Sequence, residues 1–483
     1  MRNECKQALV LSLALLSLSG CFTLPELKQA HPELPAAWPE GPAQAAIAPD
    51  WWKSYGDPVL NTLEEEALTH NADIRLAAAR IDEARANLGL ARADQYPSAQ
   101  IGVQAGRTRS TEVGSFPIPS PINNDFKVNL QAAYEVDLWG RYRKATEAAR
   151  AELLGTEYAR EVVRESLVSD VAKGYFALRA LDAQLELATE TRSNRKDAVD
   201  LQQLRFDNGI SSELDLRQAE AEHAAAEASA AQLAQSVRQQ ELALAVLLGR
   251  SPRAIVDDQV SRGNPLNALT NPPAVPAGLP SDLLTRRPDL RQAEQNLVAA
   301  QARIGEAKAA LFPDLSLTGL LGSESKRLAD LFSGPAMIWG LTAGLVQTVF
   351  NAGRTEAAIQ AADARQTQSL VGYEQAIQGA FREVLDALVA QRQSRELMEA
   401  SERRANALGK ALDLANLRYK NGIDNYLVVL DAQRNLYQAQ QNAIDARRSR
   451  LAATADLFKA LGGGWDGAVA DNKAAATSGT GSP

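Results

Sequence analysis

The sequence contains a tandem repeat, which constrains the fold more than any other feature. Thr69–Pro97 aligns without a gap with Thr285–Pro313. Two further pairs of blocks match: RFDNGI at 205–210 with RYKNGI at 418–423, and Gly140-Arg141 with Gly353-Arg354. The spacing between matched blocks is shorter in the second half, where the composition is that of an exposed loop, and loops tolerate insertions. We therefore expect one structural unit, made twice.

Phe126–Arg141 predicts a β-strand, because its residues alternate between apolar and polar. The run matches the roughly 9–11 tilted residues of a membrane strand, although a half-buried soluble sheet gives the same pattern. The second copy has a matching strand at Trp339–Phe350, interrupted by Gln347, and another short candidate lies near Ile101. The side chains expected to face lipid are Phe126, Val128, Leu130, Tyr134, Val136, Trp339, Leu341 and Leu345.

Long helices account for most of the remaining chain. A helical run is expected over 59–94, a long helix over 141–208 and a second one over 213–248, with the pattern repeated in the second half. Gly209 and Gly422 stop these helices at the hairpin turns. Each unit is therefore strand, loop, strand and long helical hairpin.

Four strands per chain cannot close a barrel, which needs at least about eight. An open strand edge cannot face lipid, because its backbone groups would have no hydrogen-bond partners there. Either several copies share a barrel or the strands lie outside a membrane. Three copies would give twelve strands, continued by a tube of helical hairpins.

The N-terminus has the features of a bacterial signal peptide. Arg2 and Lys6 precede an apolar core, and Leu18-Ser19-Gly20-Cys21 resembles a lipobox, in which Cys21 becomes the lipid-bearing first residue. The alternative is an ordinary secretory signal with an incidental cysteine. Phe22 is not the aspartate that usually retains lipoproteins in the inner membrane, which favours the outer membrane.

Composition argues against several functions. The net charge of −8 disfavours a nucleic-acid partner. The three histidines show no metal-ligand spacing, and no nucleophile elbow or phosphate loop is present. We therefore expect no enzyme, no metal and no cofactor besides the lipid on Cys21.

The sequence resembles the outer membrane factor family of TolC-like exit channels, in its lipid-anchored branch. The residues that carry the resemblance are Leu18 to Cys21, Asp57-Pro58, Ala91-Arg92-Ala93 with Pro97, Tyr134 to Arg141, Arg287-Pro288-Asp289-Leu290, Phe312-Pro313, Gly353-Arg354, Arg418 to Gly422 and Leu430 to Gln433. The resemblance implies an α+β membrane protein: a homotrimer with a 12-stranded outer-membrane β-barrel, four strands per chain, and a long periplasmic α-helical barrel.

The resemblance also implies a gate at the periplasmic tip. Leu427 would form an apolar ring and Asp431 an acidic ring, while Tyr419 and Asp215 stand where latch contacts are common. Asp424 stands where the family usually has a latch arginine. Read without the family, Leu427 could be a coiled-coil core residue and Asp431 a solvated one. The turns, with Asn208, Gly209, Asn421 and Gly422, would meet a periplasmic adaptor.

The expected organisation follows from these features. It comprises a signal peptide (1–20), a lipid anchor and tether (21–57), the first repeat (58–249), a linker (250–280), the second repeat (281–462) and a flexible tail (463–483). The expected function is a passive exit duct for small molecules, served by an adaptor and an inner-membrane transporter of the RND type. The alternatives are a lipid-anchored coiled-coil scaffold without a pore, and a duct for protein export.

Overall fold

A computed structural model describes residues 33–35, 38, 48–113, 121–270 and 280–463. The predicted signal peptide (1–20), Cys21 and residues 464–483 of the predicted C-terminal tail lie outside the described residues. The chain divides into two compact units, of which one contains Leu88–Ala151 and Leu297–Leu370. The other contains Pro32–Asn87, Glu152–Asn296 and Val371–Pro483.

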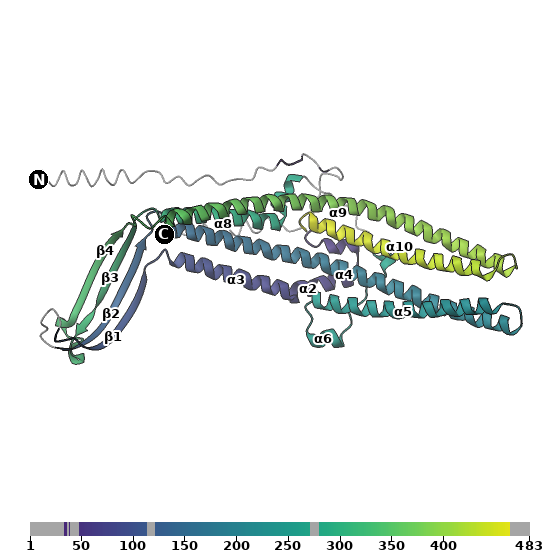
Figure 1. The fold of residues 1–483 in the computed structure, drawn as a ribbon, viewed down its shortest axis with the longest axis horizontal. Helices are drawn as coiled ribbons and strands as arrows, with labels where there is room; N and C mark the ends of the chain where they lie inside the picture. The colour runs from purple at the N-terminus through teal and green to yellow at the C-terminus, as the bar shows by residue number, and fades with distance from the viewer. Residues whose placement is uncertain (1–32, 36–37, 39–47, 114–120, 271–279, 464–483) are drawn as a thin grey trace. The chain divides into compact units, whose positions relative to one another are not determined.

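In the described ranges, helices predominate, and four strands lie between them in chain order (Figure 1). The helices are α2 (Pro58–His70), α3 (Ala72–Ala93), α4 (Arg141–Asp207), α5 (Glu213–Leu247), α6 (Pro252–Asp257), α7 (Leu283–Arg286), α8 (Pro288–Ala309), α9 (Arg354–Lys420) and α10 (Tyr426–Ala460). The strands are β1 (Ser98–Arg109), β2 (Ile122–Val136), β3 (Asp314–Ser325) and β4 (Met337–Val346). Short 3-10 turns are η1 (Trp51–Tyr55), η2 (Leu266–Ala268), η3 (Pro280–Asp282), η4 (Leu328–Asp330) and η5 (Gly334–Ala336).

The tandem repeat is confirmed by the element lengths. Helices α4 and α9 both have 67 residues, and α5 and α10 both have 35. Strands β1 and β3 both have 12 residues. Each long helix therefore has an equivalent in the other half that begins and ends at matching positions.

The first unit holds one antiparallel sheet in the order β1-β2-β3-β4 (Figure 1). Its two hairpins have the same register, since Ser98 pairs with Ala133 and the equivalent Asp314 pairs with Val346. The central pairing of β2 with β3 joins the two repeats, with Leu130 opposite Leu321.

All the strand residues predicted to face lipid lie on one face of this sheet. Directly paired residues in an antiparallel sheet point to the same side, and every second residue follows them. Val128 is opposite both Val103 and Ser323, and Trp339 is opposite Leu321. The face therefore collects Ile101, Val103, Phe126, Val128, Leu130, Tyr134, Val136, Leu315, Leu317, Leu321, Trp339, Leu341 and Leu345.

Two strands have boundaries that differ from the prediction. Strand β4 ends at Val346, so Gln347 and Val349 lie beyond it, and the Gln347 amide donates to Leu311 O at 3.2 Å. Gln347 therefore does not interrupt the strand. Strand β2 begins at Ile122, earlier than predicted, and ends at Val136.

The block that carries much of the resemblance, Tyr134 to Arg141, forms the junction between strand and helix. Trp139 Nε1 donates to Pro313 O at 2.8 Å, and its ring stacks on Phe312 with centroids 4.6 Å apart. Arg141 pairs with Glu135 at 2.8 Å and with Asp314 at 3.3 Å. These contacts tie the end of β2 to the start of β3 and so fix how the two repeats join.

The second unit contains the main hydrophobic core. Trp51 stacks on Phe458 with centroids 4.8 Å apart, and Tyr55 Oη donates to Leu451 O at 2.9 Å. Asp57 caps α2 and accepts hydrogen bonds from Tyr175 Oη at 2.6 Å and from Asn264 N at 3.0 Å. The predicted tether therefore ends as part of the core, which also includes Trp38.

One prediction about helices is corrected. The run predicted over 59–94 breaks at Asn71, which separates α2 from α3. The predicted linker 250–280 contains the short helix α6, and its role as a linker stays a prediction. None of the helices within the described ranges is long and apolar enough to cross a membrane.

Candidate functional site

The two hairpin turns are built alike. Gly209 and Gly422 adopt left-handed backbone angles, with φ of 70° and 72°. After them, Ile210 N donates to Arg205 O at 2.8 Å and Ile423 N donates to Arg418 O at 3.0 Å. This left-handed cap satisfies carbonyls at the helix end and favours glycine. The helix-stopping role of both glycines is confirmed, and their contact with an adaptor stays a prediction.

The asparagines before these glycines are also equivalent. Asn208 Nδ2 donates to Leu204 O, and Asn421 Nδ2 donates to Leu417 O, both at 2.6 Å. Both asparagines are exposed. The predicted adaptor-contact residues therefore lie at the surface of the two turns.

Asp424 and Asp215, two of the predicted gate residues, form hydrogen bonds within their own turn or helix start. Arg418 Nε donates to Asp424 at 2.6 Å, and this pairing lowers the pKa of the Asp424 carboxyl. Asp215 forms a capping box with Ser212 at the start of α5, with Ser212 Oγ donating to its carboxylate at 2.8 Å. Within one chain, both acids therefore have local partners.

Tyr419 connects two hairpins. Its hydroxyl accepts hydrogen bonds from Gln202, at 3.1 Å, and from Arg205, both on α4. Its ring also lies 5.5 Å from that of Tyr426 at the start of α10. Tyr419 thus makes an interhelical contact within the chain, with α4.

Leu427 and Asp431 share one face of α10, because residues four apart in a helix lie above one another. Leu427 is 48% exposed, and Asp431 is also exposed. Tyr426, Val429 and Leu430 are buried instead, in a cluster with Ala219 of α5 and Ala415 of α9. The start of α10 therefore packs on the first hairpin with one side and leaves the predicted gate side free.

A set of ion pairs that the sequence analysis did not identify lies about one helical turn beyond Asp431 along α10. The Glu222 carboxylate on α5 accepts from Arg434 Nε of α10 at 2.7 Å and pairs with Arg195 of α4 at 2.9 Å. Arg195 and Glu222 have side chains only 11% and 13% exposed. No local pattern identifies this group, since its partners come from three helices.

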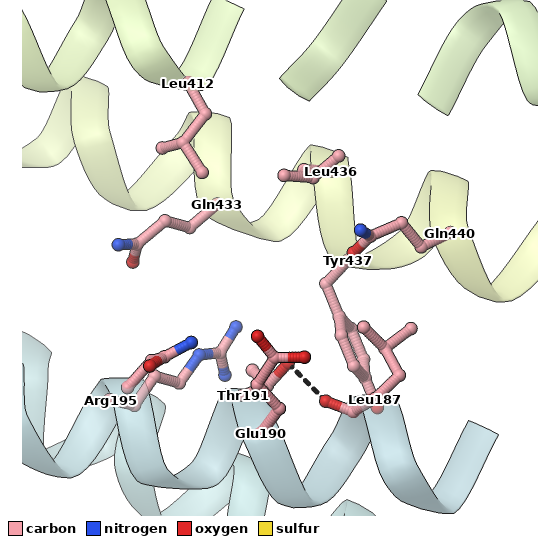
Figure 2. A pocket seen from close by; sticks show the side chains of 10 residues that line it. Leu187, Glu190, Thr191, Arg195, Leu412, Gln433, Leu436, Tyr437 and Gln440 are labelled. Atoms are coloured by element: carbon pink, nitrogen blue, oxygen red, sulfur yellow. Dashed lines mark hydrogen bonds between the residues drawn. The ribbon is translucent and has the colours of Figure 1, made fainter. Parts of the chain in front are cut away.

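A small cavity of about 180 Å³ lies beside this group, between α4, α9 and α10. Figure 2 shows Tyr437 of α10 pointing toward α4, where Arg195, Thr191 and Leu187 lie. Within the described residues, no group of three or more His, Cys, Asp or Glu side chains is arranged to hold a metal ion. The Glu222 carboxylate therefore ties α4, α5 and α10 together.

Known proteins match nearly the whole chain. The family described as outer membrane efflux protein matches residues 63–250 and 279–463. The solvent efflux pump outer membrane protein SrpC of Pseudomonas putida is 36% identical, over 94% of this chain and 97% of its own. The cation efflux system protein CusC of Escherichia coli is 34% identical, over 93% of this chain and 97% of its own.

Solved structures agree with these relatives. The outer membrane channel CmeC of Campylobacter jejuni superposes with a TM-score of 0.87 at 25% identity, covering 94% of this chain and 98% of its own. The open-state MtrE outer membrane channel of Neisseria gonorrhoeae has a TM-score of 0.83 at 32% identity, covering 92% of this chain and 98% of its own. The predicted α+β class and resemblance are confirmed. The chain belongs to the outer membrane efflux protein family, as an outer-membrane exit channel of an efflux pump that extends into the periplasm.

Proposed function

We propose that three copies of this chain form a lipid-anchored exit channel for small molecules, closed at rest by Leu427 and Asp431. The channel receives substrate from an RND-type transporter through a periplasmic adaptor. The observation that carries the trimer is the sheet, whose outer strands β1 and β4 each have one edge without a partner strand among the residues that the structure describes.

The tandem repeat predicts how the edge of β4 in one copy pairs with the edge of β1 in the next. Strand β4 is the equivalent of β2, and β1 is the equivalent of β3. The pairing of Leu130 with Leu321 within the chain therefore places Ala343 of one copy opposite Ala105 of the next. In the same way, Ala132 with Gly319 places Leu345 opposite Val103. Both new pairs lie on the apolar face, so that face continues unbroken from copy to copy.

Three copies joined in this way give twelve strands, which is enough to close a barrel. The apolar face then meets lipid. The other face carries Lys127, Asn129, Gln131 and Glu135 on β2, which suit a watery lumen.

A disulfide experiment tests this register. Paired residues in an antiparallel sheet have Cα atoms about 4.5–5.5 Å apart, within reach of a disulfide. Ala105→Cys/Ala343→Cys should give covalent trimers on oxidation. The matched control is Ala105→Cys/Leu341→Cys, two positions out of register, which should stay monomeric in denaturing gels. Equal cross-linking of both pairs, or none of the first, contradicts the proposed closure.

The proposed gate is supported by the exposed side of α10, which carries Leu427 and Asp431. Three copies of Leu427 around one axis form an apolar constriction, which blocks ions by excluding water. Three copies of Asp431 one turn away form an acidic ring, which favours cations. Their exposure within one chain is what such rings need.

The substrate class follows from the relatives. Their names mention solvents, toluene, antibiotics and cations, all of which are small. Small-molecule efflux is therefore favoured over protein export, and the scaffold without a pore does not fit a member of this family. Cys21 is proposed as the lipid site because of the lipobox alone.

A further inference from the structure

The apolar face of the sheet carries charge at only one place within the four described strands. Arg107 and Arg109 of β1 lie on the same face as Val103, because every second residue of a strand points to the same side. The other charged residues of the strands lie on the opposite face: Asp125, Lys127, Glu135, Asp314 and Glu324. We call Arg107 and Arg109 the arginine pair.

The arginine pair lies at the extracellular end of the sheet. Helix α3 leads into β1 and β2 leads into α4, so both helices join the end where Ser98 pairs with Ala133. Arg109 pairs with Ile122 at the other end, beside the loop that connects the two strands. The helices of this outer-membrane channel extend into the periplasm, and the loop end of the sheet therefore faces the cell exterior.

The arginine pair begins where the apolar band ends. On β2, the apolar face runs from Phe126 to Val136, ten residues apart, which at about 3.4 Å per residue and a tilt of about 40° spans about 26 Å along the membrane normal. The apolar band of a membrane barrel is about 25 Å tall. Ala105 is opposite Phe126, so Arg107 is the next residue on this face beyond the band. A charged side chain is costly at the bilayer midplane and tolerated at the interface, which places the pair at head-group level.

Both guanidinium groups are free to bind an anion. Arg107 is exposed, and its side chain has no hydrogen bond or ion pair with any residue that the structure describes. Arg109 pairs with Glu112 at 3.5 Å, but the two side chains are 74% and 62% exposed. Exposed ion pairs contribute little to stability, so a phosphate can replace the Glu112 carboxylate at small cost.

In the proposed trimer, the arginine pair lies at the contact between two copies. The register argued above for β4 and the next copy's β1 places Leu341 opposite Arg107 and Trp339 opposite Arg109. Trp339 is 75% exposed within one chain. Tryptophan is enriched where the apolar and head-group regions of a membrane meet, which agrees with the level of the arginine pair. We call the arginine pair with Trp339 of the adjoining copy the rim site.

The tandem repeat limits the rim site to the contacts between copies. The residues of β3 equivalent to Arg107 and Arg109 are Ser323 and Ser325, which pair with β2 inside the chain. The contact between the two repeats of one chain therefore lacks the charges that the contact between copies has. A trimer has three rim sites and not six.

We propose that each rim site binds the phosphate groups of a lipid in the outer leaflet of the outer membrane. Guanidinium groups bind phosphate through two parallel hydrogen bonds, and the lipids of this leaflet carry phosphates on their sugar head groups. The apolar face below the arginine pair takes the acyl chains of the same lipid. The placement between copies rests on the proposed trimer, whereas the assignment of the arginine pair needs only the sheet.

Native mass spectrometry of the full-length protein in detergent tests the proposal. Diphosphoryl lipid A is the probe, added without divalent cations, which would compete for its phosphates. The proteins are wild type, Arg107→Gln, Arg107→Gln/Arg109→Gln and Lys127→Gln. Lys127→Gln is the matched control, because it removes one positive charge from the opposite face of the same sheet. Lipid A stripped of its phosphates is the second probe, and inorganic phosphate is the competitor.

Wild type should bind up to three molecules of diphosphoryl lipid A per trimer. The double variant should bind it at least about tenfold more weakly, because charge-assisted hydrogen bonds are lost, and Lys127→Gln should bind as wild type does. Stripped lipid A should bind wild type as weakly as the intact lipid binds the double variant, a comparison that needs no variant to fold.

Four results overturn the lipid site: equal binding to wild type and the double variant, equal weakening by Arg107→Gln and Lys127→Gln, equal binding of stripped and intact lipid A, or displacement of the lipid by inorganic phosphate at equal concentration. The last result would identify a site for free phosphate. The same spectra report the mass of the assembly. A wild-type protein that is not trimeric overturns the proposed trimer and the placement between copies, whichever lipid result accompanies it.

Discussion

Arg287 Nη1 donates a hydrogen bond of 2.8 Å to the carbonyl oxygen of Ala460, the last residue of α10. The first repeat contains the same relationship in other residues: Asn71 Nδ2 donates at 2.8 Å to the carbonyl of Leu247, the last residue of α5. In each half, the residue just before the shorter helix, α3 or α8, thus donates a hydrogen bond to the carbonyl of the last residue of the long hairpin. This contact gives the Arg287-Pro288-Asp289-Leu290 block a structural role.

Replacing Arg287 should destabilise the second unit. Its guanidinium is 8% exposed and also pairs with Asp289 and Glu383, both at 2.7 Å. Arg287→Ala leaves the Ala460 carbonyl without this donor and two acids without their counter-charge, which costs about 2–4 kcal/mol of unfolding free energy. Denaturant unfolding measures the loss. Arg286→Ala is the neighbouring control, and a loss as large as that for Arg287→Ala contradicts the assigned role.

Glu165 should make stability depend on pH. Burial raises the pKa of its carboxyl from 4.5 to about 8, although the charge of Arg287 opposes the shift. Because the folded chain holds this proton more tightly, the stabilisation is complete below about pH 4.5 and is lost as pH rises toward 8. Glu165→Gln should remove this part of the loss in unfolding free energy, which is on the order of a few kcal/mol.

The measurement is the difference in melting temperature between Glu165→Gln and wild type at pH 6 and pH 9. The difference should favour the variant more at pH 9. Comparing the two proteins cancels the contributions of other titrating groups, such as the buried Glu64, whose pKa is also raised by burial. A difference that does not change with pH would show that Glu165 is already ionised in the folded chain.

Gly322 should be essential for the sheet. A Cβ atom at this position would lie 2.3 Å from Val128 O and 2.8 Å from Asn129 Cα on β2. Gly322→Ala should therefore disrupt the β2–β3 pairing and reduce the yield of folded protein in the outer membrane. Gly340→Ala on β4 is the matched control, because a Cβ there meets nothing within 4 Å. Equal yields of the two variants would contradict the register of β3.

Cys21 should carry a lipid. Cys21→Ser should abolish incorporation of labelled palmitate, and the mature N-terminus of wild type should begin at residue 21 with the mass of a lipidated cysteine. Mass spectrometry of the purified protein measures both. An unmodified Cys21, or cleavage elsewhere, would favour the ordinary secretory signal.

Much of this architecture follows from the sequence. The match of Gly209 with Gly422 placed both hairpin turns, and the alternation around Leu130 identified the strand that joins the repeats. Asn71 was missed because the apolar stripe runs on across it, although its Oδ1 caps α3 locally by accepting from Asp73 N and Ile74 N. The Glu222–Arg434 pair was missed because its partners lie 212 residues apart, beyond the reach of any local pattern.

The most direct test of the central claim is single-channel conductance of the purified trimer in planar bilayers, with and without Leu427→Ala/Asp431→Ala. We predict small or rare openings in wild type and a sharp rise in the double variant. Conductance in both proteins without a difference would move the gate away from α10. No conductance from either folded trimer would contradict the exit channel itself.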